Sequence, residues 1–206
     1  MNASSSAPAG QEKGEARRQQ VLDAASACFR RNGFHGTSIA KISKAAGMSP
    51  GHIYHYFENK EAIVEAIAKR EEQNLSELAR KLQEDESGGS LATRVARQTS
   101  DSVDRCLDPA YLELQLELAA EAARNPAIQR ILRQSDKVVT GEFMALSNRV
   151  GLPSGMDAAE VELRMNMISA IFNGVMVRGA VGAEVDRRQV TRLVEKLVRC
   201  LLDDAD

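Results

Sequence analysis

Apolar residues recur every three or four positions along most of this 206-residue chain, which is the spacing of one helix face. No segment keeps the strict alternation that is typical of a half-buried strand. Leucines do alternate between positions 112 and 118, but the surrounding Ala and Glu residues favour a helix that is buried on more than one side. The pattern therefore predicts an all-α fold.

Capping and helix-breaking residues divide this pattern into about nine helices. Ser, Thr, Asp or Asn marks a helix start, Pro often follows, and Gly marks a helix end. The predicted helices cover residues 15–31, 37–46, 50–57, 60–84, 91–107, 109–124, 126–150, 157–178 and 187–202. Residues 1–14 are rich in Ser, Ala, Pro and Gly, so we expect a disordered tail there.

Residues 37–57 predict two short helices joined by a tight turn. Thr37 is expected to cap the first helix, and Gly47 ends it, because glycine adopts the left-handed conformation without penalty. Ser49 caps the second helix, with Pro50 at its first position. Helical spacing directs one set of apolar residues inward: Ile39, Ile42, Ala46, Met48, Ile53 and Phe57.

The opposite side of the second helix is polar. It carries Gly51, His52 and His55, and Tyr54 and Tyr56 lie on its flanks. Two helices in this order, with a polar and aromatic outer face on the second, predict a helix-turn-helix whose second helix enters a DNA major groove.

The same residues resemble the DNA-binding domain of the tetracycline-repressor-like (TetR) family. The resemblance covers roughly residues 17–67 and rests on Phe29, Asn32-Gly33-Phe34, Thr37-Ser38-Ile39-Ala40-Lys41-Ile42, Ala46-Gly47-Met48-Ser49, Ile53-Tyr54-His55-Tyr56-Phe57 and Asn59-Lys60-Glu61. It implies a one-component transcriptional regulator and leaves the effector open. Residues 15–60 would form the DNA-binding domain, and residues 61–206 the regulatory, ligand-binding and dimerisation domain.

By this resemblance, Pro50, Gly51 and His52 meet base edges, whereas Tyr54, His55 and Lys60 meet phosphates. The alternatives are a half-buried packing role for Tyr54 and a solvated side chain for Lys60. Other candidates for backbone contacts are Thr37, Ser38 and Lys44, with helix capping or free solvation as their alternatives.

Charge is distributed unevenly in a way that suits this reading. Residues 1–60 hold eight Lys and Arg against four Asp and Glu, a net charge of +4, and the remainder carries 19 against 25, a net charge of −6. A basic end on an acidic body suits a protein that approaches phosphates with that end, although chance asymmetry of this size is the alternative.

Cys28, Cys106 and Cys200 are isolated in the sequence, and each is expected to be a small core residue. No metal-ligand spacing is present, and we expect neither a metal nor a cofactor. Residues 1–14 lack the apolar stretch of a signal peptide, and no apolar run is long enough to cross a membrane. The sequence therefore predicts a cytoplasmic protein.

The remaining helices predict a ligand pocket of about 300–1,000 Å³, bounded by residues 60–178. Methionine adapts to varied apolar ligands, although a methionine cluster is more often plain core. Glu117 and Glu121, one turn apart on the helix over 109–124, are candidates for contact with a cationic ligand or simply for a solvated face. The candidate lining residues are Tyr111, Leu114, Glu117, Leu118, Phe143, Met144, Met165, Asn166, Met167 and Asn173.

In the TetR family the last two helices of each subunit pair across a dimer as a four-helix bundle. By this resemblance we expect a homodimer whose interface includes Ser169, Ala170, Val177, Leu193, Leu197 and Leu201. The stripe that contains Asn166 and Asn173 either joins this interface or faces the pocket.

The sequence thus predicts a repressor that binds a palindromic double-stranded DNA operator and is released by a small apolar or amphipathic effector. One alternative is a DNA-binding protein of the same fold without an effector. The other is an enzyme, which the sequence disfavours because all three histidines lie in residues 1–60 and no catalytic pairing stands out.

Overall fold

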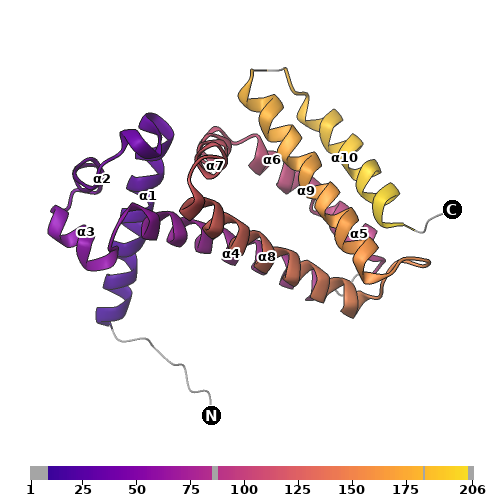
Figure 1. The fold of residues 1–206 in the computed structure, drawn as a ribbon. Coiled ribbons are helices and arrows are strands. Elements are labelled where there is room, and N and C mark those ends of the chain that lie inside the picture. Colours follow the sequence, from indigo (N-terminus) through magenta and orange to yellow (C-terminus); the bar gives the residue numbers. More distant parts are fainter. Residues whose placement is uncertain (1–8, 85–87, 183, 204–206) are drawn as a thin grey trace, which may run out of the picture.

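The computed structural model describes residues 9–84, 88–182 and 184–203, and within these ranges the chain forms ten α-helices and no strand (Figure 1). The all-α prediction is confirmed. The helices are α1 (Ala9–Gly36), α2 (Ile39–Ala46), α3 (Pro50–Tyr56), α4 (Lys60–Glu84), α5 (Leu91–Arg97), α6 (Thr99–Cys106), α7 (Pro109–Ala122), α8 (Pro126–Val150), α9 (Ala158–Ala180) and α10 (Arg187–Leu202).

Two differences from the predicted elements have local causes. The single helix predicted over 91–107 is broken at Gln98, whose ψ is 0° and whose N–H donates to the Val95 carbonyl three residues back. No Gly or Pro marks this break, so the sequence pattern conceals it. The tail predicted over 1–14 is wrong for residues 9–14, which form the start of α1; residues 1–8 lie outside the described ranges.

Helix starts follow the predicted capping chemistry. Ser49, Asp108, Asn125 and Asp157 each accept a hydrogen bond from a backbone N–H of the first turn, and such a cap is worth about 1 kcal/mol. The prediction of Thr37 as a cap is wrong, because the neighbouring Ser38 accepts from the Lys41 N–H instead.

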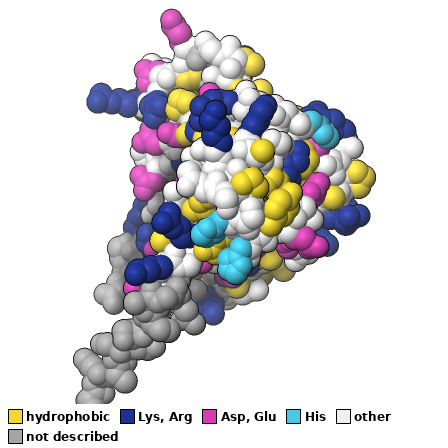
Figure 2. Space-filling view, turned by 90° about the vertical axis from the view of Figure 1, so that its left-hand side faces the viewer, with side chains coloured by type: hydrophobic (Ala, Val, Ile, Leu, Met, Phe, Trp, Pro, Cys, Tyr) yellow, Lys and Arg dark blue, Asp and Glu magenta, His cyan; other side chains and the backbone are white. Residues whose placement is uncertain are grey.

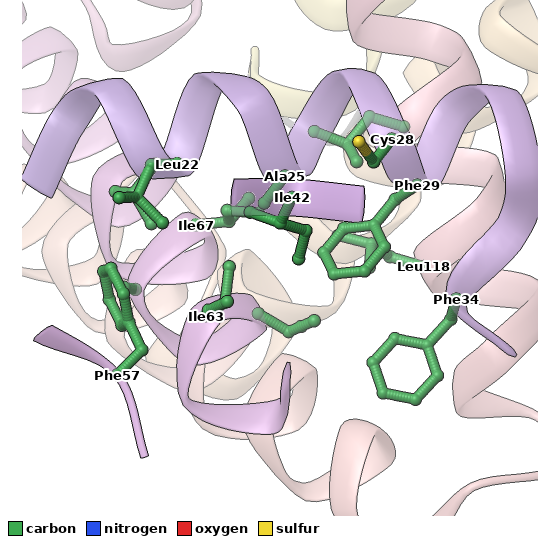
Figure 3. Packing of buried hydrophobic residues seen from close by; sticks show 14 of the residues in the cluster. Leu22, Ala25, Cys28, Phe29, Phe34, Ile42, Phe57, Ile63, Ile67 and Leu118 are labelled. Carbon is green, nitrogen blue, oxygen red and sulfur yellow. The ribbon is translucent and has the colours of Figure 1, made fainter. Parts of the chain in front are cut away.

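The hydrophobic core has a head section, a body section and a small third cluster of Cys106, Leu112 and Met176. The head section joins α1, α2, α3 and the start of α4, and it also includes Leu114 and Leu118 of α7 and Ile128 of α8. Figure 3 shows Leu118 beside Phe29 within this packing. The body section joins the far ends of α4 and α8 to α5, α9 and α10, and α4 and α8 run side by side between the two sections (Figure 1).

The end of α1 is fastened to α7 through a bend at Gly33. This residue has a φ of 70° and a ψ of 169°, and a Cβ here would lie 3.1 Å from Oε1 of Glu117. The bend turns the Phe34 N–H toward Glu117 Oε1, at 2.8 Å, while the Phe34 carbonyl accepts from Lys60 Nζ at 2.7 Å. Only glycine combines this backbone conformation with this close approach.

A second contact lies beside the first. The carboxylate of Glu121 is fully buried, and its Oε1 lies 3.1 Å from Nε2 of His35. Arg124 and Asn125 also donate to this carboxylate, at 3.0 and 2.9 Å. Hydrogen bonding from several donors makes the buried charge tolerable. Glu117 and Glu121, which were predicted to face a cationic ligand or solvent, therefore join the body to the head.

The cysteine prediction is confirmed for Cys28 and Cys106, which are buried, and is wrong for Cys200, which is exposed on α10. Among the described residues, no helix combines the length and apolar composition that a bilayer crossing requires.

We expect Leu118→Ala to lower the free energy of unfolding by about 2–5 kcal/mol, because a fully buried leucine leaves a cavity where α7 meets the head. Urea unfolding followed by circular dichroism measures the change. Leu152→Ala is the matched control, since Leu152 is exposed and should cost well under half as much. Equal losses in the two variants would contradict this packing.

Candidate nucleic-acid interface

The turn between α2 and α3 has the local geometry that its sequence predicts. Gly47 has a φ of 63° and a ψ of 35°, and the Met48 N–H donates to the Ser43 carbonyl at 2.9 Å. Ser49 Oγ then accepts from the His52 N–H at 3.3 Å, which starts α3. A glycine in the left-handed region closes α2, so α3 can begin three residues later at a fixed angle.

The inward face of the helix-turn-helix is buried as predicted. Ile42 and Ile53 are fully buried, Ala46 and Phe57 nearly so, and Met48 packs against the same cluster. This packing fixes the orientation of α3 and leaves its other face outside.

The outer face of α3 is an aromatic and polar surface. The His52 ring stacks on Tyr56 with ring centroids 5.5 Å apart, and His55 meets Tyr56 edge-on at 5.1 Å. Tyr54 is 56% exposed beside them. Aromatic contacts of this kind stabilise the orientations that His52, His55 and Tyr56 adopt in the free protein.

Figure 2 looks onto the side of the molecule that carries α2 and α3. Histidine side chains lie there among Lys and Arg side chains, with apolar groups between them. Lys44 of α2 is exposed, whereas Lys41 is not free, because its Nζ donates to the Gly36 carbonyl at 2.7 Å.

One predicted contact residue, Thr37, is engaged inside the protein, whereas its neighbour Ser38 is not. Thr37 is 1% exposed; its hydroxyl donates to the Cys28 carbonyl at 3.0 Å and its N–H to the Phe34 carbonyl at 3.3 Å. These bonds use the hydroxyl hydrogen and the N–H hydrogen of Thr37. They favour a role inside the protein over a phosphate contact for this residue. Ser38 is exposed and caps α2.

Lys60 is neither solvated nor free. It is half-buried, and its ammonium lies 4.2 Å from the Phe34 ring centroid in addition to donating to the Phe34 carbonyl. An ammonium has three donors, so a phosphate contact through another N–H stays a prediction.

Pro50 and Gly51 are exposed in the first turn of α3. A Cβ added at Gly51 would meet no atom within 4 Å, so internal packing does not require glycine at this position. The absence of a side chain instead leaves room for close approach by a partner.

In the body, five of the predicted pocket residues share a cavity of about 190 Å³: Tyr111, Phe143, Met165, Asn166 and Asn173. The cavity is smaller than predicted. It lies among helices α4 to α9, which are the elements that the sequence indicated. Sequence reasoning missed Arg105, because the predicted helix over 91–107 concealed the separate helix α6 that carries it.

The other predicted pocket residues lie elsewhere. Leu114 and Leu118 belong to the head section of the core, and Glu117 binds the Phe34 N–H. Met144 packs against the body section, and Met167 is 51% exposed on α9. The periodicity of α7 showed that its leucines are buried but could not show that their partner is α1.

The predicted interface residues divide into two groups. Ala170 and Val177 of α9 and Leu193 and Leu197 of α10 are exposed. Ser169 is also exposed, but it lines the rim of the cavity with the exposed Asn166 and Asn173, and Leu201 packs partly buried on the body section.

Comparison with known proteins agrees with this geometry. Residues 21–67 match the model of the bacterial regulatory proteins of the tetR family, and residues 102–203 match the C-terminal model of BetI-type transcriptional repressors. The chain belongs to the tetR family. It is a DNA-binding transcriptional regulator and not an enzyme.

Individual relatives cover most of the chain. It is 28% identical over 179 residues to the HTH-type transcriptional regulator BetI of Serratia proteamaculans, which covers 86% of this chain and 88% of that protein. It is 29% identical over 157 residues to the HTH-type transcriptional regulator UidR of Escherichia coli, covering 75% and 76%. The solved structure of Salmonella enterica GusR superposes with a TM-score of 0.74 at 28% identity, covering 91% of this chain and 95% of that chain.

We expect Gly51→Ala to raise the free energy of unfolding by up to about 1 kcal/mol and yet to weaken operator binding. The added methyl group has space in the free protein but would occupy the surface that approaches DNA. Thermal unfolding and fluorescence anisotropy with labelled DNA measure the two effects.

Gly141→Ala is the matched control, because a Cβ there also meets no atom within 4 Å but lies on α8 of the body. It should stabilise the fold and leave DNA affinity unchanged. If both variants bind DNA like the wild type, Gly51 is not at the contact surface.

Proposed function

We propose that this regulator is a repressor that binds a palindromic operator as a homodimer and releases it when a small amphipathic molecule enters the body. The single observation that carries the proposal is the outer face of α3. It is polar and aromatic, it is ordered by ring contacts, and its helix is oriented by a buried inner face. A helix with these properties suits insertion into a major groove.

The residues of this face have distinct proposed roles. His52 reads a base edge, with Gly51 and Pro50 allowing the approach of α3 to the groove. Phosphate contacts, which position the protein without reading sequence, come from Ser38, Lys44, Tyr54, His55 and Lys60.

The proposed dimer contact lies on α9 and α10. Exposed apolar or small residues follow one face of α9 at spacings of four and three: Leu163, Met167, Ala170, Gly174, Val177 and Val181. Leu193 and Leu197 continue this surface on α10. An exposed apolar surface of this length is typical of a protein interface, and two-fold pairing would set the two α3 helices to read successive grooves about 34–36 Å apart.

The proposed effector site is the 190 Å³ cavity. One of its walls is α4, which begins four residues after α3 ends, so a change in α4 reaches the reading head directly. A ligand acts on DNA binding only through its different affinity for the two arrangements of the head. Because an operator lies on the bacterial chromosome, we expect the protein to work in the cytoplasm.

The size of the cavity also supports a second candidate function. Ligand sites usually have volumes of about 300–1,000 Å³, so a cavity of 190 Å³ is compatible with a DNA-binding protein that has no small-molecule effector. The two candidates share the same head and differ in whether ligand binding changes operator affinity.

We expect His52→Ala to cost about 1–3 kcal/mol of operator affinity and to relax the preference at one base pair of each half-site, because a base contact is lost. Lys44→Ala should weaken binding to all sequences alike and reduce the dependence of affinity on salt, because a phosphate contact is lost. Anisotropy titrations on the operator, on its single-base variants and over a range of salt concentrations measure both effects. An unchanged base preference in the His52 variant would remove that residue from the proposed reading role.

We expect Leu197→Glu to produce a monomer and to reduce affinity for the full operator to that for a single half-site, because a charge would be buried in the proposed interface. Sedimentation velocity gives the oligomeric state. Leu152→Glu, at an exposed leucine in the loop between α8 and α9, is the control and should remain dimeric. A dimer that persists in the Leu197 variant would argue against this interface.

A further inference from the structure

The cavity in the body is apolar along most of its wall. It lies among helices α4 to α9 and has a volume of about 190 Å³. The side chains that determine its apolar character are Leu78, Val139, Phe143, Ile168, Phe172 and Met176. A cavity of about 150 Å³ lined in this way holds benzene, so the space suits a body of one ring.

One end of the cavity is polar and contains a cationic group. Arg105 Nη1 donates to Glu71 Oε1 at 3.0 Å, and the Tyr111 hydroxyl donates to the same oxygen at 3.0 Å. The Arg105 guanidinium lies 5.1 Å from the Tyr111 ring centroid. Arg105 and Tyr111 line the cavity, whereas Glu71 approaches them from α4 behind the wall.

These two donors are suited to an anion. Among the described residues, Glu71 is the one hydrogen-bond partner of the Arg105 guanidinium, which has five N–H groups. Burial and, next, the Glu71 carboxylate raise the pKa of Tyr111 above its ordinary value, so its hydroxyl keeps its proton at neutral pH and remains a donor. Arginine and a hydroxyl together match the geometry of a carboxylate.

The cavity lining is less suited to binding a cation. Asp136 is the acidic residue of the cavity lining, and it is exposed, so water screens its charge. Glu71 is already bound by Arg105, Tyr111 and Asn74, and it lies outside the lining. The less screened charge in the cavity lining is therefore the positive charge of Arg105.

We propose that the effector is a small amphipathic carboxylate with a single-ring apolar body, and that its carboxylate replaces Glu71 on Arg105 and Tyr111. This inference rests on the proposed function of the protein as an effector-controlled repressor. Two carboxylates on one guanidinium would repel each other, so binding of the ligand and the contact with Glu71 exclude one another.

The exchange would act on the reading head through α4. Arg70, next to Glu71, donates to Asp23 of α1 at 2.6 Å, so adjacent residues of α4 contact the head and the body. Release of Glu71 removes the polar contact that holds this part of α4 to α6 and α7. The freed carboxylate keeps Asn74 as a partner, at 3.4 Å, and gains water.

The test uses three probes that share one ring and differ in charge: phenylacetate, phenylacetamide and phenethylamine. Calorimetry with the full-length protein measures their affinities, and anisotropy measures operator affinity with and without each probe. We expect phenylacetate to bind at least tenfold more tightly than the other two and to weaken operator binding. Operator binding is measured first without any probe. If the protein does not bind the operator, the proposed function is contradicted, but the probe affinities still test the proposed ligand class of the cavity.

Three variants separate charge recognition from packing. Arg105→Gln should abolish the preference for the anion, and Arg105→Lys should retain part of it. Glu71→Gln should bind phenylacetate several-fold more tightly, because its competitor is gone, and should lose most of the response of operator affinity to the probe. Circular dichroism and thermal unfolding confirm that each variant is folded.

Several results would overturn the proposal. Equal affinities for phenylacetate and phenylacetamide would remove the role of Arg105, and tighter binding of phenethylamine would assign the cavity to cations. Failure of all three probes to bind would contradict the proposed size and class of ligand. Tight binding of phenylacetate with no effect on operator affinity, or no gain in the Glu71 variant, would contradict the exchange with Glu71.

Discussion

The main chain of Phe34 is bound on both sides, and this pair of hydrogen bonds determines how the reading head is attached to the body. Its N–H donates to Glu117 of α7, and its carbonyl accepts from Lys60 at the start of α4. Both bonds depend on the bend at Gly33, which only a residue without a Cβ can make at this distance from Glu117. The position of α3 relative to the body therefore depends on contacts of α1 with α4 and α7.

The same two helices also form walls of the cavity. Tyr111 of α7 lines it directly, and α4 contributes Leu78 to the wall and Glu71 to the polar end. Residues that bind the head and residues that line the cavity thus lie on the same continuous helices, α4 and α7. A helix transmits displacement along its length because its backbone hydrogen bonds are all internal. This sharing gives a physical route between the cavity and α3 that requires no further moving element.

The sequence predicted those features that depend on neighbours along the chain. Gly47, Ser49 and Pro50 define the turn of the helix-turn-helix through backbone preference and capping, and these operate within four residues. Features that depend on tertiary partners were not predictable. The spacing of Glu117 and Leu118 in the sequence indicates a helix with buried and polar positions. Only the folded structure reveals that α1, and not a ligand, is the partner of these two residues.

Two further differences have the same origin. Thr37 and Ser38 are both capping residue types, and in the structure Thr37 is buried against α1 while Ser38 caps α2. No residue type in the sequence marks the break at Gln98. The sequence pattern therefore did not separate α6, which carries the cationic group of the cavity, from α5. Stacking of His52 on Tyr56 could be expected from their helical spacing, whereas the attachment of Lys60 to Phe34 joins residues 26 positions apart and could not.

If two copies of α3, held at a fixed separation, read DNA, footprinting of the protein on the DNA that flanks its own gene should show it. We expect two protected half-sites related by two-fold symmetry, with centres about 10–10.5 base pairs apart or a multiple of that spacing. Protection of a single unsymmetrical site, or half-sites whose spacing varies without loss of protection, would contradict this expectation.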